Sequence, residues 1–302
     1  MKPLLFALPG NEDLTARLAG RLDGDVGSLE TRQFPDGETY VRLNSDVDTR
    51  SVVLVCTLDR PDNKTLRLLF AADAARDLGA AHIGLVAPFL AYMRQDKRFQ
   101  PGEAITSSAY AKLLSVNFDW IVTVDPHLHR RSSMAEIYSI PVSVCHAAPS
   151  ISGWIREQVS NPVVIGPDVE SEQWVGAVAE SAGAPFTTLE KIRRGDRDIE
   201  IKVRDLEQWR DRQPVLVDDI ISSGRTMEAA IGHLVAQGFA APVIVGVHGL
   251  FAEHAFERLQ AAGAEQIVST NTVPHASSVI DLSDLIQAAV RPFTEVEMLR
   301  RA

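Results

Sequence analysis

The chain contains few of the residues that define several protein classes. Only 2 of its 302 residues are cysteine, and aromatic residues make up 6%. Cys56 and Cys145 therefore provide neither the disulfide framework of a small secreted domain nor the paired spacing of a zinc site. Because both lie among apolar residues, we expect them to be buried free thiols.

An excess of positive charge is also absent. Lys and Arg number 30 and Asp and Glu 40, which gives a formal net charge of −10. A surface with this balance repels phosphate-rich polymers, so the sequence argues against general binding to nucleic acid or to anionic membranes. A local basic site for a small anion is still compatible with it.

No uninterrupted apolar segment is long enough to span a bilayer. One long stretch without charged residues, 229–252, is interrupted by His233, Pro242 and His248, and it indicates a helix, a turn and a buried strand. The apolar start, residues 1–8, is too short for the hydrophobic region of a signal peptide. We therefore expect a soluble, cytoplasmic protein that makes no contact with membranes.

Short runs rich in valine and isoleucine recur along the chain. Strands this continuously apolar are typical of parallel sheets that are buried on both faces. Segments with helical spacing separate them, and this alternation indicates βαβ units. The length and the 45% hydrophobic content favour two globular domains at about 150 residues each. We predict two similar doubly wound α/β domains with parallel sheets. The runs are 52–55, 83–86, 120–124, 163–165, 215–217 and 243–247.

A faint internal repeat supports a duplicated domain. The run at 53–55 and the run at 215–217 each open a unit of strand, helix and strand, at a spacing of about 160 residues. The chain should leave the first sheet between residues 141 and 149. We therefore predict domains at 1–145 and 146–302.

The segment 214–226 carries the strongest indication of chemistry. An apolar strand is followed by Asp218 and Asp219 and then by a loop of hydroxyl residues and glycine that opens a helix. Backbone N–H groups at such a helix start suit a phosphate monoester. Two carboxylates can accept hydrogen bonds from sugar hydroxyls or hold Mg²⁺ through water. A simpler alternative is that Asp219 and Ser223 only cap the helix, but the combination favours a sugar-phosphate site.

The same loop resembles the 5-phosphoribosyl 1-diphosphate motif shared by phosphoribosyltransferases and ribose-phosphate diphosphokinases. Further segments are similar to the ribose-phosphate diphosphokinase (PRPP synthetase) family, in the family's order, and they cover the chain from Phe34 to Thr272. These segments are F-P-D-G-E at 34–38, Y-M-R-Q-D at 92–96, D-P-H at 125–127, K-I-R at 191–193, V-H-G at 247–249 and T-N-T at 270–272.

The resemblance implies phosphoribosyltransferase-like domains and an Mg²⁺-dependent transfer of a diphosphoryl group from ATP to ribose 5-phosphate. It also implies an adenine site shared between neighbouring subunits, and hence a homo-oligomer that is at least a dimer. The implied roles are ATP binding by Phe34, Asp36, Glu38, Arg94 and Gln95; ribose 5-phosphate binding by Asp218, Asp219, Ser222, Ser223, Gly224, Arg225 and Thr226; metal binding by His127 and Asp168; and catalysis by Lys191 and Arg193.

Lys191 and Arg193 lie in a polar stretch, 191–198, between an apolar strand and the next element. By themselves, such basic clusters are usually solvated surface. With the resemblance, the stretch is interpreted as a mobile loop whose cations close over the charge that develops on the transferred group.

Two loops depart from the family's pattern. The phosphate loop usually reads D-D-x-x-D-T-G-G-T, whereas here Ser222, Ser223 and Arg225 replace its third Asp, first Thr and second Gly. A non-glycine residue at position 225 would be strained if its φ angle were positive. The family's P-D-x-G-G turn becomes 167–171 here, which loses both glycines and adds Glu170. Because this turn holds metal, pyrophosphate or effector in the family's members, the resemblance leaves classical allosteric regulation open.

The sequence favours an active ribose-phosphate diphosphokinase over two alternatives. A phosphoribosyltransferase would consume the diphosphate product, and the chain length and the segments at 34–38, 94–96 and 191–193 argue against it. A catalytically silent regulatory homologue would bind an active relative. Intact Lys191 and Arg193 argue against that alternative, and Arg225 and Glu170 leave it open.

Overall fold

The structure is a computed structural model that describes residues 2–295 except 129, 168–170, 194–198 and 204–205. Its contacts divide the chain into two compact units. The first comprises Met1–Cys145 and Leu282–Ala302, and the second comprises His146–Asp281. The predicted second domain, 146–302, therefore has to be shortened at its C-terminal end.

Helix α8 (Ser283–Thr294) explains this correction. It is amphipathic, and its apolar face buries Ile286 and Val290. The Phe293 ring stacks on Trp120 of the first unit, with centroids 4.8 Å apart and an interplanar angle of 9°. The helix packs on α1 (Glu12–Leu22) and on the strands β7 and β8 of the first unit. Burial of this apolar face returns the chain to the first sheet.

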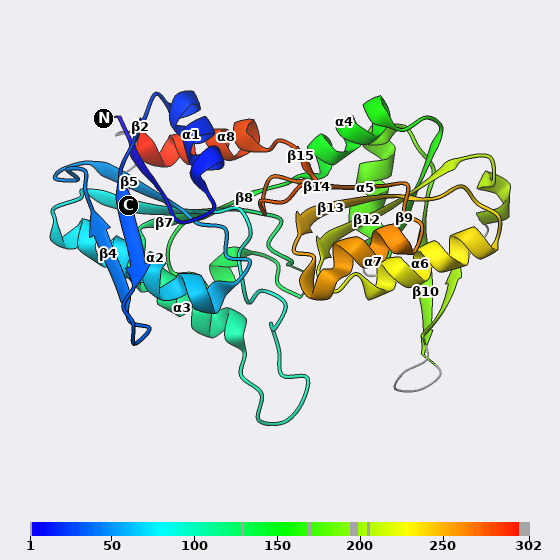
Figure 1. Cartoon of the computed structure of the whole chain (residues 1–302), viewed down its shortest axis with the longest axis horizontal. Coiled ribbons are helices and arrows are strands. Elements are labelled where there is room, and N and C mark those ends of the chain that lie inside the picture. Colours follow the sequence, from blue (N-terminus) through cyan, green and yellow to red (C-terminus); the bar gives the residue numbers. More distant parts are fainter. Residues whose placement is uncertain (1, 129, 168–170, 194–198, 204–205, 296–302) are drawn as a thin grey trace. The chain divides into compact units, whose positions relative to one another are not determined.

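The first unit is built on a six-stranded parallel sheet with the strand order β2-β1-β5-β6-β7-β8. All residues of β5 and β7 are buried, as expected for strands covered on both faces. Helices α1 and α8 cover one face, and α2 (Pro61–Asp77) and α3 (Thr106–Asn117) cover the other (Figure 1). The strands are β1 (Leu4–Ala7), β2 (Asp25–Val26), β5 (Ser51–Val55), β6 (His82–Ala87), β7 (Trp120–Val124) and β8 (Val142–Cys145).

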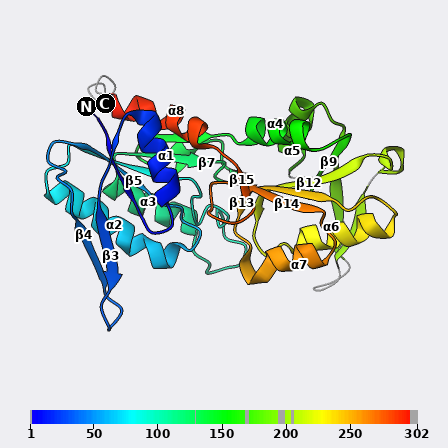
Figure 2. The same ribbon diagram turned by 45° about the horizontal axis from the view of Figure 1, so that its top comes forward.

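A separate two-stranded antiparallel hairpin belongs to the first unit. It consists of β3 (Leu29–Gln33) and β4 (Thr39–Leu43), and its connection is the segment 34–38. Figure 2 shows the hairpin extending away from the main sheet. The segment 34–38 therefore lies at an exposed tip.

The second unit contains a seven-stranded sheet with the order β11-β10-β9-β12-β13-β14-β15. Every neighbouring pair is parallel except β10 and β11. Helices α4 (Ala148–Gln158) and α5 (Glu172–Ala182) cover one face, and α6 (Arg225–Ala236) and α7 (Ala255–Ala261) cover the other (Figure 1). The strands are β9 (Pro162–Gly166), β10 (Phe186–Arg193), β11 (Ile199–Val203), β12 (Gln213–Ile221), β13 (Val243–Gly249), β14 (Gln266–Thr270) and β15 (Ser278–Ile280).

The predicted fold class is confirmed, because each unit is a doubly wound α/β layer structure. Each of the six apolar runs predicted as strands lies within a strand. Two single-turn helices, η1 (Met134–Glu136) and η3 (Leu206–Trp209), and a turn with left-handed backbone, η4 (Ala252–His254), complete the described secondary structure.

The stretch 191–198 begins differently from the loop expected for it. Strand β10 continues through Arg193 and pairs with β11, with Lys191 opposite Ile201 and Arg193 opposite Ile199. Backbone pairing with the alternating apolar residues of β11 thus places both cations on an antiparallel hairpin rather than in a loop. Their side chains lie outside the described part of the structure, as do residues 194–198.

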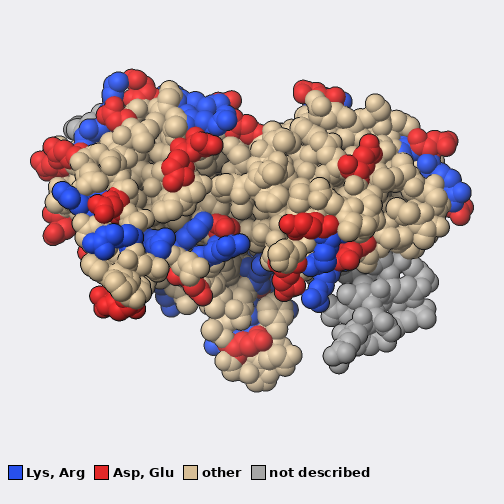
Figure 3. Space-filling model, viewed as in Figure 1, with Lys and Arg blue, Asp and Glu red and all other residues tan. Residues whose placement is uncertain are grey.

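The distribution of charged side chains and the burial of the two thiols agree with what the sequence predicts. Acidic and basic side chains are interspersed over the face shown in Figure 3. Cys56 and Cys145 are buried free thiols, as predicted, and burial raises the pKa of each to about 12. Among the helices of the described residues, none is both long enough and apolar enough to cross a bilayer.

Candidate active site

The sugar-phosphate loop begins inside strand β12. The strand continues to Ile221, so Asp218 and Asp219 lie within it and not after its end, as the sequence had suggested. Pairing with β13 sets Asp218 opposite Gly246 and keeps the strand in register to its last residue. Both carboxylates are half-buried, and one oxygen of Asp218 accepts the Asp219 N–H at 2.9 Å.

Gly224 makes the turn from the loop into α6. Its φ angle is 68°, in the left-handed region that favours glycine. A Cβ atom at this position would lie 3.3 Å from the Ala255 Cβ and from a methyl group of Leu259, both on α7. The backbone angle and the close approach of α7 therefore both require glycine here.

The carbonyl oxygens and the N–H groups of the loop differ in their hydrogen bonding. The carbonyl oxygens of Ile221 and Ser222 accept N–H groups of residues 250–252 at 3.0–3.1 Å, and that of Ser223 accepts from Arg258. By contrast, within the part of the chain that the structure describes, the backbone N–H groups of residues 222–226 have no hydrogen-bond acceptor. A run of unused N–H groups at a helix start is the arrangement that binds a phosphate.

Arg225 does not carry the strain that the sequence raised as a concern. It is the first residue of α6 and is not among the residues with positive φ. Its guanidinium is largely exposed and lies 3.4 Å from the Glu253 carboxylate. An exposed ion pair of this kind adds little to stability, so Arg225 can exchange this partner for a bound anion.

Two groups next to the loop had no assigned role in the sequence. Arg258 on α7 contacts the loop backbone directly. In addition, buried His248 at the end of β13 lies 2.9 Å from the Thr272 hydroxyl, and Thr270 donates to the Val247 carbonyl at 2.7 Å. The V-H-G and T-N-T segments are thus joined in one buried network, which only the three-dimensional pairing of β13 with β14 brings together.

The hairpin tip of the first unit carries Phe34, Asp36 and Glu38. Gly37, at a φ of 92°, allows a tight turn in which the Phe34 N–H donates to the Glu38 carbonyl at 2.8 Å. The Asp36 side chain accepts the Glu38 N–H at 3.1 Å. All three side chains are exposed, so the tip presents a ring and two carboxylates to whatever lies beyond the subunit.

Arg32 stiffens the base of this tip. Its guanidinium lies 4.6 Å from the centroid of the Phe34 ring and 4.3 Å from that of Tyr40, and the two rings meet edge to face at 6.0 Å. Cation–π contacts of exposed groups contribute about 0.5–1 kcal/mol each. The Phe34 ring is therefore held in place although it is exposed.

Arg94 and Gln95 lie in the connection between β6 and α3. Arg94 is exposed, and the Gln95 side-chain oxygen accepts from the Thr106 hydroxyl at 3.0 Å. The neighbouring Asp96, which had no predicted role, has a side chain only 4% exposed and pairs with Arg130 at 3.2 Å. This ion pair, with its buried carboxylate and an exposed guanidinium, helps to fix the backbone that presents Arg94.

A cavity of about 470 Å³ lies beside this connection. Its lining includes Tyr92, Tyr110 and Asp62. Tyr92 has a left-handed backbone, with φ at 63°, and its hydroxyl donates to Asp62. Burial and the neighbouring Asp62 raise the pKa of Tyr92 to about 12. The phenol therefore remains a neutral hydrogen-bond donor at physiological pH.

His127 follows β7 in a strained turn. Its φ is 55° and that of Asp125 is 32°, and the His127 N–H donates to the Asp125 carbonyl at 2.9 Å. Left-handed conformations cost non-glycine residues about 1–2 kcal/mol, and they cluster at functional sites. No group of three or more potential metal ligands occurs among the residues described. The second predicted ligand, Asp168, lies outside the described residues.

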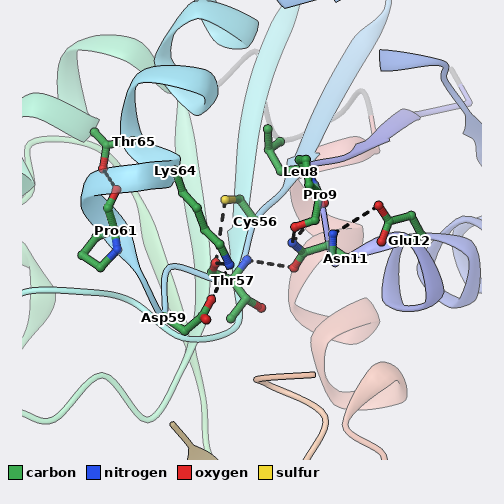
Figure 4. A network of polar contacts seen from close by, with 11 residues as sticks. Leu8, Pro9, Asn11, Glu12, Cys56, Thr57, Asp59, Pro61, Lys64 and Thr65 are labelled. Carbon is green, nitrogen blue, oxygen red and sulfur yellow. Dashed lines mark hydrogen bonds and ion pairs between the residues drawn. The ribbon is translucent and has the colours of Figure 1, made fainter. Parts of the chain in front are cut away.

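A polar network joins the loops after β1 and β5, at the carboxyl edge of the first sheet (Figure 4). The Asn11 side chain accepts the Thr57 N–H at 2.8 Å and donates to the Leu8 carbonyl at 3.1 Å. Lys64 donates to the Thr57 carbonyl at 2.8 Å and pairs with Asp59. Since Asp59 neutralises Lys64, this network fixes the loops after β1 and β5 and does not offer an uncompensated cation.

The predicted ligand-binding residues that the structure describes thus form two groups, and Lys191 and Arg193 lie on β10 of the second unit. The ribose 5-phosphate residues lie together at the end of β12 and the start of α6, in the second unit. The predicted ATP residues and His127 lie in the first unit, on the β3–β4 hairpin and in the connections that follow β6 and β7.

Comparison with known proteins decides the family. The model of the N-terminal domain of ribose phosphate pyrophosphokinase matches residues 3–117, and the phosphoribosyl transferase domain model matches residues 133–283. The chain belongs to the ribose-phosphate pyrophosphokinase family. This is the family, under its other name, that the sequence motifs resemble, and the predicted resemblance is confirmed.

Individual ribose-phosphate pyrophosphokinases are similar over almost their whole length. Those of Methanopyrus kandleri and Methanothermobacter thermautotrophicus are 34% and 32% identical, and the matches cover 95% and 94% of this chain and 98% of each relative. The crystal structure of phosphoribosylpyrophosphate synthetase from Mycobacterium smegmatis is 27% identical, with a TM-score of 0.85, and the match covers 97% of this chain and 99% of that one.

Membership of a ribose-phosphate pyrophosphokinase family confirms that the chain is an enzyme of the transferase and kinase class. Neither alternative is favoured. A phosphoribosyltransferase corresponds to the second matched model alone, whereas here both domains match in order and the relatives are covered end to end.

Proposed function

We propose that this chain transfers the β,γ-diphosphoryl group of ATP to O1 of ribose 5-phosphate, giving 5-phosphoribosyl 1-diphosphate and AMP. The observation that carries the proposal is the loop after β12, where the carbonyls of residues 221–223 are hydrogen-bonded and the N–H groups of residues 222–226 have no acceptor in the described part of the chain. This polarity suits the phosphate of the acceptor, and the family model covers both domains.

The acceptor would be held by its two ends. The loop residues 222–226 would bind the 5-phosphate, with the Ser222, Ser223 and Thr226 hydroxyls beside the N–H groups. Asp218 and Asp219 would accept hydrogen bonds from ribose hydroxyls, which fixes the sugar relative to its phosphate. Arg225 would add a cation at the start of α6, where the helix dipole also favours an anion.

The donor would be held by the first unit of one subunit and the hairpin tip of another. Arg94 and Gln95 would bind ATP, and Phe34, Asp36 and Glu38 would contact the adenine of a neighbouring subunit. A tip that presents a ring and two carboxylates away from its own sheet supports such sharing. We therefore propose a homo-oligomer that is at least a dimer, and cytoplasmic like its substrates.

A divalent ion fits the residues present. Mg²⁺ keeps several waters and usually takes only one or two protein ligands when phosphates supply the rest. His127 and Asp168 are the proposed metal residues; Asp125 beside His127 adds a carboxylate to a site whose main oxygen donors would be phosphates. When bound, the ion would neutralise triphosphate charge.

The bond changes define the reaction. The O1–Pβ bond forms, the bond between Pβ and the oxygen that bridges Pα and Pβ breaks, the hydroxyl proton of O1 leaves, and AMP departs with the bridging oxygen. In such a transfer most catalysis comes from positioning and from fixed charge around the transferred group. Lys191 and Arg193 are the proposed cations for this charge.

A product assay tests the proposal. With ATP, Mg²⁺ and ribose 5-phosphate, we expect AMP and 5-phosphoribosyl 1-diphosphate in equal amounts. Attack at the γ-phosphorus would leave ADP instead, so ADP as the stoichiometric product would overturn the assignment. ATP binding without turnover would instead indicate a regulatory homologue.

A further inference from the structure

Arg258 is tied to the phosphate loop by its guanidinium group. One terminal nitrogen donates to the Ser223 carbonyl, the other donates to the Glu253 carbonyl at 2.5 Å, and Nε donates to the Glu228 carboxylate at 3.4 Å. These acceptors belong to the loop itself, to the segment before α7 and to the first turns of α6. One half-buried side chain thus connects three backbone segments.

The segment held by Arg258 is strained. Phe251, Glu253 and His254 have φ angles of 42°, 54° and 58°, which are left-handed values in three non-glycine residues. Each costs about 1–2 kcal/mol relative to an ordinary conformation. Such a segment persists only where its surroundings fix it, and here Arg258 binds its central carbonyl, at Glu253.

The strained segment is also what fixes the carbonyls of the phosphate loop. The N–H groups of Phe251 and Ala252 donate to the Ile221 and Ser222 carbonyls, at 3.1 Å each. Arg258 then takes the next carbonyl, that of Ser223. Three successive carbonyls are therefore held by residues 250–252 and by Arg258, whereas the N–H groups of residues 222–226 have no acceptor among the described residues.

We propose that Arg258 is a positioning residue for the phosphate of the acceptor, acting through the loop and the 251–254 segment without touching the substrate. This inference rests on the proposed function. Arg258 would preorganise the loop before phosphate binds. Without the guanidinium, the N–H groups would have to be ordered when phosphate binds, and part of the binding free energy would be lost to that ordering.

The geometry requires arginine at this position. A guanidinium presents donors on three nitrogens in one plane, and all three are used here. A lysine ammonium is a point charge on a flexible chain and does not reproduce that planar fork. Arg258→Lys should therefore resemble Arg258→Ala in its binding of phosphate, although it keeps the charge.

The test measures acceptor binding in the intact chain. Ribose 5-phosphate and inorganic phosphate are titrated by calorimetry into wild type, Arg258→Ala and Arg258→Lys, and KM values are measured for both substrates. We expect about a tenfold or greater loss of ribose 5-phosphate affinity in both variants, with ATP KM changed by less than about twofold. Added guanidinium ion should restore part of the lost affinity in Arg258→Ala only.

Arg212→Ala is the matched control. This arginine also lies in the second unit and donates to a single backbone carbonyl, that of Pro162, at 3.2 Å. It sits next to the start of β12, at the opposite end of the strand from the loop. Its removal should leave ribose 5-phosphate affinity within about twofold of wild type.

The outcomes separate this inference from the proposed function. If folded Arg258 variants bind ribose 5-phosphate as tightly as Arg212→Ala does, the positioning role is wrong even when the enzyme makes 5-phosphoribosyl 1-diphosphate. If the wild type makes no such product but loses phosphate affinity when Arg258 is changed, the proposed function fails and the positioning role stands. Should Arg258→Ala not fold, Arg258→Lys decides the question by the same titration.

Discussion

Two short segments that carry predicted binding residues are built in opposite ways. The hairpin tip at 34–38 is exposed, and apart from the contacts of the Phe34 ring with Arg32 and Tyr40 its described contacts are bonds within its own turn. The phosphate loop at 222–226 is held by residues 250–252, by Arg258 and by the packing of Gly224 on α7. The difference agrees with their proposed ligands. A small anion needs a preformed ring of N–H groups inside one subunit, whereas a tip that reaches a neighbour is completed by that neighbour.

Both segments are proposed binding elements, so neither should dominate the chemical step. Lys191 and Arg193 are the proposed catalytic cations, and interactions made only in the transition state lower kcat when removed. We expect Lys191→Ala and Arg193→Ala each to reduce kcat by roughly a hundredfold or more, with less than about tenfold change in ATP KM. Steady-state kinetics would check this; near-normal kcat in both variants would make the β10–β11 hairpin an ordinary basic surface.

The glycines of the two segments give the next largest contrast. Gly224 and Gly37 both have positive φ, at 68° and 92°, but only Gly224 has a neighbour within 4 Å of an added Cβ. Gly224→Ala should cost about 2–4 kcal/mol of unfolding free energy, because backbone strain and overpacking add. Gly37→Ala should cost only about 1–2 kcal/mol, from strain alone.

Binding should separate the two variants further. Gly224→Ala should weaken ribose 5-phosphate binding about tenfold or more, since the loop must shift away from α7. Gly37→Ala should leave that affinity unchanged. Calorimetric titration and thermal unfolding measure both properties, and equal effects of the two substitutions on ribose 5-phosphate would contradict the comparison.

More of the fold than of the site could be predicted from the sequence. Continuous valine and isoleucine runs predict parallel strands because burial on both faces leaves no polar positions, and the run at 215–217 indeed lies in β12. The sequence assigned α8 to the wrong unit, because an amphipathic pattern shows that a helix has an apolar face but not which sheet that face covers. The end of β10 was missed as well, since backbone pairing with β11, and not composition, extends β10 through Lys191 and Arg193.

Within the site, local motifs were visible and long-range supports were not. Residues 222–226 stand out by composition alone. Arg258 lies 35 positions after Ser223 and carries no local pattern. The left-handed angles at Phe251, Glu253 and His254 occur in residues that do not ordinarily adopt them, so no sequence rule would have located the strain.

A third prediction tests the sugar end of the preformed site. Asp219→Ala should weaken ribose 5-phosphate binding by about 1–3 kcal/mol, because a partner of a sugar hydroxyl is lost. ATP binding to the free enzyme should change much less, since the predicted ATP residues lie in the other unit. Titration of each substrate separately measures this. Loss of ATP with ribose 5-phosphate retained would reverse the assignment of the two segments.

The smallest predicted effect is the contribution of His275, which lies beside the 251–254 segment, to the pH dependence of the free energy of unfolding. His275 packs against the rings of Phe251 and Phe256, with centroids 4.5 and 4.7 Å away. Burial lowers the pKa of His275, while Glu257 acts in the opposite direction. Its Nδ1 also accepts the Ser277 N–H at 3.1 Å, so the neutral ring must carry its proton on Nε2, and protonation at Nδ1 would break this bond.

The sign of the effect follows from this lowered pKa. The unfolded chain binds the proton at the ordinary histidine pKa of about 6.5, and the folded chain binds it only at lower pH. Unfolding therefore takes up a proton as pH falls below about 6.5, and the free energy of unfolding decreases there.

His275→Gln should remove this part of the pH dependence, because the amide does not titrate. We expect the wild-type free energy of unfolding to decline more steeply than that of His275→Gln between about pH 7 and pH 5, as measured by denaturant unfolding, with the His275 ring titrating below the ordinary histidine pKa by NMR. A ring that titrates at or above that pKa would mean that the contact with Phe251 does not persist in solution, and the description of this region as preformed would have to be given up.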